Sequence, residues 1–234
     1  MDKLQKYKPT DKMIDLIGDN YFLLQVMSRF GLSLGFGDKT VKEVCEMNNV
    51  DCQTFLVVVN FMAEGFSRMD GSADDISIPA LVDYLRQAHI YFLDYCLPAI
   101  RRKLIEAIDC SQDDVSFLIL KFFDGYMREV RKHMEYEEKT VFKYVDTLIH
   151  GNAPKNYQIS TFSKHHDQVG ERLTELKNII IKYCPAKANT NVLNAALFDI
   201  YACEEGLESH CKVEDYLFVP AILKLERRMR ENEK

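Results

Sequence analysis

His133-Met-Glu-Tyr-Glu137 and, later in the chain, His210-Cys-Lys-Val-Glu214 repeat one pattern, a histidine followed by a glutamate four residues on. In an α-helix, side chains four residues apart lie on one face, about one turn from each other. Each pair can therefore direct an imidazole and a carboxylate toward the same point. A single pair of this kind is more often a surface ion pair, so the interpretation depends on what surrounds the two copies.

The surrounding sequence predicts long helices. Proline and glycine are scarce, and the alternation typical of strands is rare. Short polar breaks separate the helical stretches, and long helices joined by short connections are antiparallel neighbours. We therefore expect an up-down four-helix bundle. Its helices are predicted at residues 79–108, 113–148, 157–182 and 190–229.

A small domain is predicted before this bundle. The polar segment from Met69 to Asp75 interrupts the helical pattern. Upstream of it, Thr40 and Glu43 have the spacing of a capping box, which begins one of several short helices. The chain is therefore predicted to be all-α, with a small helical domain at residues 1–70 and the four-helix bundle at 76–230.

Each long stretch carries a histidine on its apolar side. His89 lies in the first stretch, His133 in the second and His210 in the fourth, while the third contains the adjacent pair His165 and His166. A lone histidine on an apolar face is usually a satisfied core residue. An uncompensated charge there is costly, however, and two glutamates accompany these histidines. Together they predict a buried metal site.

The number of ligands indicates which metals fit. Four imidazoles and two carboxylates are too many for one tetrahedral zinc ion. They suit two transition-metal ions with bridging carboxylates and terminal imidazoles. Iron is the first choice, with manganese or zinc as substitutes, and open positions would bind a small molecule. Three tyrosines can hydrogen-bond to such a site, although aromatic residues at helical spacing are more often core: Tyr84, Tyr126 and Tyr136.

Composition narrows the classes of function. A net charge of −6 gives no general attraction to nucleic acid. No apolar run approaches the roughly 20 residues of a membrane helix, and the N-terminus does not resemble a signal peptide. Seven cysteines without a CxxC pair fit a reducing compartment better than a disulfide framework. We therefore expect a cytoplasmic protein that binds neither membrane nor nucleic acid.

The ligand segments resemble the hemerythrin-like family, and more closely its iron–sulfur cluster repair (repair of iron centres) subfamily. The similar segments run from 133 to 142, from 166 to 170 and from 210 to 220, within about 150 residues of resemblance. The family pattern HDxxG selects His166 over His165, which is left as a neighbour of the site. Oxygen-carrying hemerythrins use a second histidine on this helix, where this chain has Phe162 and Gly170. The resemblance implies a carboxylate-bridged di-iron centre held by His89, His133, Glu137, His166, His210 and Glu214.

The N-terminal part is similar to the small domain of the repair proteins from Phe30 to Cys45. Gly35 and Phe36 stand where that domain has adjacent cysteines. The resemblance implies a role in nitrosative or oxidative stress, with damaged iron–sulfur proteins as partners and repair by iron donation or nitric oxide chemistry. Two alternatives remain open: an oxygen or nitric oxide sensor that signals through the N-terminal domain, and an iron-binding protein without turnover. Whether the protein is an enzyme or a homodimer is left open.

Overall fold

The computed structural model describes residues 6–64, 76–108, 114–152, 157–164, 169–185 and 188–232. Over these residues the chain forms helices and no strand, and one isolated antiparallel bridge joins Lys12 to Thr40. The predicted all-α class is confirmed. No helix in the described ranges combines the length and the apolar character needed to cross a membrane.

The chain divides into two compact units. One contains residues 1–88 together with 212–234, and the other contains residues 89–211. The domain boundary expected near residue 70 falls at 65–75, outside the described residues, and stays a prediction.

Short helices fill the N-terminal part of the first unit. The predicted capping box is present: Thr40 Oγ1 accepts a hydrogen bond from the Glu43 backbone N–H, and the Glu43 carboxylate accepts one from the Thr40 N–H. Asp51 similarly accepts a hydrogen bond from the Thr54 N–H at 2.7 Å, which caps the next helix. The helices are α1 (Met13–Asp19), α2 (Leu23–Arg29), α3 (Val41–Met47) and α4 (Cys52–Glu64).

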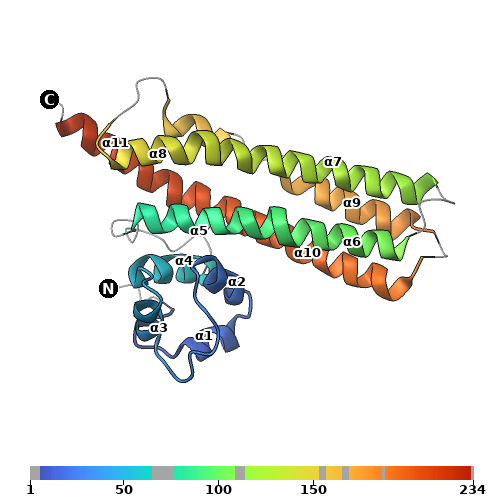
Figure 1. Cartoon of the computed structure of the whole chain (residues 1–234), viewed down its shortest axis with the longest axis horizontal. Helices are drawn as coiled ribbons and strands as arrows, with labels where there is room; N and C mark the ends of the chain where they lie inside the picture. The colour runs from blue at the N-terminus through green and yellow to red at the C-terminus, as the bar shows by residue number, and fades with distance from the viewer. Residues whose placement is uncertain are drawn as a thin grey trace. The chain divides into compact units, whose positions relative to one another are not determined.

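Ion pairs between neighbouring helices define the order of the four helices in the second unit. Arg101–Asp124 joins α6 (Leu97–Ala107) to α7 (Asp114–Tyr136), and Arg172–Glu129 joins α7 to α9 (Val169–Tyr183). Lys177–Glu204 joins α9 to α10 (Thr190–Val213), and Lys103–Asp199 joins α10 back to α6. The helices therefore form a closed ring in chain order, the arrangement of an up-down bundle, and lie side by side in Figure 1.

Three of the long helices contain a π-helical segment. The first runs through α5 (Ile78–Ile90), η3 (Tyr91–Cys96) and α6, and the last through α10, η6 (Glu214–Phe218) and α11 (Val219–Asn232). Pro98 and Pro220 each follow such a segment by two residues. Because proline has no N–H and its ring clashes with the carbonyl four residues back, it disfavours a regular α-turn there. The second helix runs through α7, η4 (Glu137–Val141) and α8 (Phe142–Ile149) without a proline.

The third predicted stretch differs from expectation. Its first part is the 3₁₀-helix η5 (Ile159–Lys164), and a regular α-helix resumes only at α9. Ser160, Thr161 and Ser163 fall within η5. Serine and threonine are neutral to unfavourable inside α-helices, which is consistent with a tighter turn here.

Candidate metal centre

The predicted ligands lie where α-helix changes to π-helix. Glu137 is the first residue of η4, Glu214 is the first residue of η6, and His89 stands two residues before η3. A π-segment changes the direction in which successive side chains leave the helix, and such segments recur at functional sites. The irregular turns therefore coincide with the residues that the sequence singled out.

Glu137 contacts imidazoles from two helices. Its Oε2 lies 2.9 Å from His89 Nε2, and its Oε1 lies 2.9 Å from His133 Nε2. The Glu137 side chain is fully buried. A carboxylate with each oxygen directed at a different imidazole has the arrangement that a bridging ligand between two cations needs.

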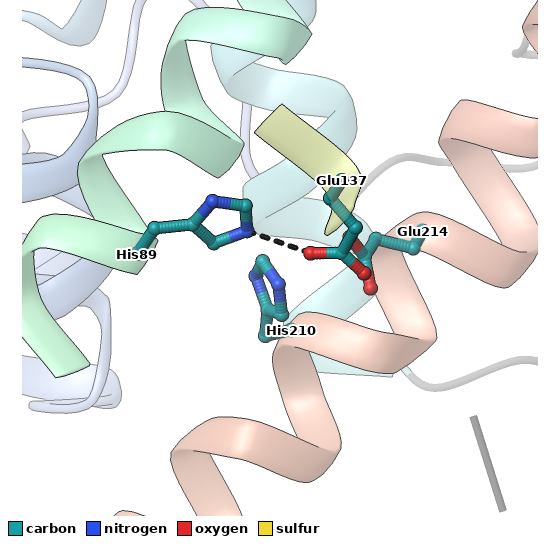
Figure 2. A group of neighbouring side chains, drawn as sticks. All are labelled: His89, Glu137, His210 and Glu214. Atoms are coloured by element: carbon teal, nitrogen blue, oxygen red, sulfur yellow. Dashed lines mark ion pairs between the residues drawn. The ribbon is translucent and has the colours of Figure 1, made fainter. Parts of the chain in front are cut away.

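Four of the predicted ligands form one cluster, which Figure 2 shows. One possible ligand atom from each of His89, Glu137, His210 and Glu214 lies within 4.8 Å of the others. All four residues are at most 3% exposed. Glu214 lies one turn beyond His210 on a continuous helix, and the assignment of these residues as metal ligands stays a prediction.

Aromatic rings surround the imidazoles. The Phe142 ring is stacked on His89 at a centroid distance of 5.5 Å, and the Phe92 ring meets His210 edge-on at 6.1 Å. These rings keep water from the imidazoles. Two carboxylates and several imidazoles gathered in such surroundings are costly unless a cation neutralises them. The donor set therefore fits a metal centre.

The comparison with known families agrees with this geometry. Residues 80–222 match the hemerythrin HHE cation binding domain. The chain belongs to this family. No curated protein was found to match the chain.

Glu138 is a residue of this hemerythrin HHE domain that was not among the site residues expected from the sequence. Its Oε1 lies 2.9 Å from His89 Nδ1. When Nδ1–H donates to Glu138, the lone pair of Nε2 is directed toward Glu137 and the ligand cluster, because only one ring nitrogen of a neutral imidazole carries a proton. The spacing of a regular helix does not predict that Glu138 contacts His89. The only hint in the sequence is that Glu138 directly follows the predicted ligand Glu137.

Of the remaining predicted ligands, His133 is described by the structure and His166 is not. The His133 side chain is 15% exposed and reaches the cluster through its contact with Glu137. His165 and His166 lie outside the described residues, so the predicted ligand from the third helix stays a prediction. His150, which is not among the predicted ligands, has a side chain that is 70% exposed.

The three candidate tyrosines make different contacts. The Tyr84 hydroxyl accepts a hydrogen bond from Arg29 at 3.2 Å, and the Tyr136 hydroxyl lies 3.5 Å from that of Tyr157. Tyr126 is 1% exposed, and its hydroxyl has no hydrogen-bond partner among the described residues. Burial raises the pKa of Tyr126 far above its ordinary value.

Proposed function

We propose that this protein is a di-iron protein of the nitrosative and oxidative stress response that helps repair damaged iron–sulfur clusters. The observation that carries the proposal is the buried Glu137 carboxylate, whose two oxygens each face an imidazole. Two iron ions would be held by His89, His133, Glu137, His210 and Glu214, with His166 from the third helix. A mixed set of imidazoles and carboxylates suits iron, with manganese or zinc as substitutes.

The protein residues would have distinct roles in such a site. Iron would supply redox chemistry and open positions for nitric oxide or oxygen. Glu137 would bridge, and Glu138 would fix the orientation of His89. Phe92 and Phe142 would keep the site dry, which strengthens the electrostatic interactions inside it. Either nitric oxide chemistry or iron donation would then assist a damaged iron–sulfur protein in the cytoplasm.

Metal analysis with an optical spectrum of the purified protein tests the centre itself. Two irons per chain with oxo-to-iron charge-transfer bands are the expected result. One tetrahedral zinc per chain, retained after growth with excess iron, would contradict the di-iron assignment.

Reactivation of a nitrosylated iron–sulfur enzyme tests the repair function. The iron-loaded protein should restore activity, and His133→Ala should not, because it removes an imidazole that contacts Glu137. His150→Ala is the matched control, since this histidine is exposed and pairs only locally with Asp146. Equal recovery with His133→Ala and the unmodified protein would rule out a role for the centre in repair.

A sensor is the second candidate, and one contact favours it. In the first unit, the Phe61 ring of α4 lies 6.3 Å from the Tyr216 ring of η6. Tyr216 is two residues after Glu214, so a change at this ligand has a short path to an N-terminal helix. Hydrogen exchange along α4, with and without nitric oxide, measures this coupling. Unchanged exchange in the iron-loaded protein would exclude the sensor.

A further inference from the structure

Two cysteines lie in register with two of the ligands. Cys96 follows His89 by seven residues, and Cys203 precedes His210 by seven. The helix that contains α6 and the helix α10 run in opposite directions in the ring of helices (Figure 1). The step from His89 forward to Cys96 and the step from His210 back to Cys203 therefore point the same way along the bundle. Seven residues correspond to two helical turns, about 10 Å along the axis. The cysteines therefore form a layer two turns from the ligand layer.

The two thiols contact each other inside this layer. Cys96 is 8% exposed and Cys203 is 2% exposed. Their side chains hydrogen-bond to each other, and this bond together with burial raises the pKa of the Cys203 thiol well above its ordinary value. Neither cysteine is part of a disulfide. Both side chains are thus buried and shielded from reagents in solution.

Tyr126 belongs to the same layer. It precedes His133 by seven residues on α7, a helix that runs antiparallel to α6. Its buried hydroxyl has no hydrogen-bond partner among the described residues. Cys203 and Cys96 are among the groups whose charge would act on this hydroxyl, so it lies near the thiols. An unpartnered buried hydroxyl beside two thiols provides an O–H that can donate a hydrogen bond to a thiolate when a thiol proton leaves.

We propose that Cys96 and Cys203 are a redox-active thiol pair that supplies two electrons to chemistry at the metal centre. This inference rests on the proposed function and identifies its electron donor. Two S–H bonds break and one S–S bond forms, which releases two protons and two electrons. With nitric oxide as oxidant, two thiols and two nitric oxide molecules give one disulfide, one nitrous oxide and one water. Each thiol proton ends in the water.

The arrangement favours electron transfer through the protein over direct attack on the thiols. Direct oxidation requires an exposed thiolate, and burial with a raised pKa removes that species. Cys45 and Cys52, in the first unit, provide an internal comparison. Their thiols also hydrogen-bond to each other, but Cys52 is partly exposed and no predicted ligand stands near them in the sequence. This pair should not respond to the metal.

The test exposes the reduced full-length protein to nitric oxide without oxygen, in iron-loaded and metal-free forms. Alkylation and mass spectrometry report a Cys96–Cys203 disulfide, and gas analysis reports nitrous oxide. We expect the disulfide only in the iron-loaded form, with one nitrous oxide per disulfide. Cys203→Ala should abolish the first turnover that proceeds without added reductant. Cys52→Ala is the matched control and should retain it.

Three results would overturn the role. Nitric oxide consumption with both thiols still reduced would remove the pair as donor while leaving the proposed function intact. Equal disulfide formation in the metal-free protein would show direct oxidation in solution. Retention of the first turnover by Cys203→Ala, with folding verified by circular dichroism, would assign the electrons to another source. An iron-loaded protein that consumes no nitric oxide would instead count against the proposed nitric oxide chemistry itself.

Discussion

The N-terminal residues and the bundle bury polar side chains in different ways. In the N-terminal part, Asn60 is 5% exposed and forms two hydrogen bonds with the Tyr7 backbone, at 2.8 and 3.0 Å. In the bundle, Glu137 is fully buried and faces two imidazoles at 2.9 Å. The amide of Asn60 is neutral and matches a neutral peptide group. The carboxylate of Glu137 brings a charge that a neutral imidazole only partly offsets.

This difference separates a structural polar residue from a functional one. A neutral hydrogen-bonded group stabilises the fold at a small desolvation cost. A cluster of buried ionisable groups costs folding free energy unless a cation is present, so its presence indicates a binding role. We therefore expect substitutions in the two regions to affect different properties, and four variants test this.

Glu137→Gln should have the largest effect. If the proposed iron centre is present, loss of the Glu137 charge should weaken iron binding at least about 100-fold, the upper end of what losing an outer hydrogen-bond partner costs a metal site. The metal-free variant should be as stable as the parent, or more so, because a buried charge is removed. Competition with a chelator measures the affinity, and urea unfolding measures the stability. Unchanged iron affinity would contradict the view that buried charges in the bundle serve binding while buried polar groups in the N-terminal part serve stability.

Asn60→Ala should show the opposite behaviour. It leaves the Tyr7 backbone N–H and C=O buried without these partners, so the free energy of unfolding should fall by about 2 kcal/mol. Iron affinity should not change. Urea unfolding of the metal-free protein and the same chelator competition check both statements. A weaker iron site in this variant would show that Asn60 is not purely structural.

Lys177→Met tests a partly buried ion pair of the bundle, which lies between the neutral Asn60 and the fully buried Glu137 in character. Lys177 pairs with Glu204, which also accepts a hydrogen bond from Thr174, and the Glu204 side chain is 21% exposed. Because Glu204 is partly exposed, loss of its partner should lower the free energy of unfolding by only about 1–2 kcal/mol. Adding Glu204→Leu should recover most of this loss in urea unfolding. No recovery would mean that Lys177 acts mainly through the cation–π contact of its ammonium with the Tyr201 ring.

Thr40→Ala should have the smallest effect. Removing the helix cap of α3 should lower the free energy of unfolding by about 1 kcal/mol, with no change in iron affinity. Thr40→Ser is the control, because it keeps the capping hydroxyl. A loss equal to that of Asn60→Ala would mean that this exposed cap does more than satisfy one backbone N–H.

Patterns that act within one helix could be predicted from the sequence. The capping box at Thr40 and Glu43 was predicted from a spacing of three and is present. The convergence of His89, Glu137 and His210 followed from helical period and apolar face, and the hemerythrin HHE match agrees with it. These features depend on regular helical geometry, which fixes where side chains at short spacing point.

Contacts that depend on irregular turns could not be predicted. Glu138 was not expected at the site, yet it contacts His89, because η4 begins at Glu137 and changes the direction of the following side chains. The 3₁₀-turn of η5 was likewise missed, since periodicity assumes a regular α-helix. A pattern with a period of 3.6 residues contains no information on where that period fails.

The sequence by itself determined that the chain is helical and that two His-x-x-x-Glu pairs exist, and it predicted a histidine on the apolar side of each long helix. Only the tertiary structure decided that Glu137 joins His89 to His133 and that Cys96 meets Cys203. Cys96 and Cys203 are more than a hundred residues apart in the chain. Their meeting depends on which helices are neighbours and on their relative heights, which packing of the whole ring sets and local spacing does not.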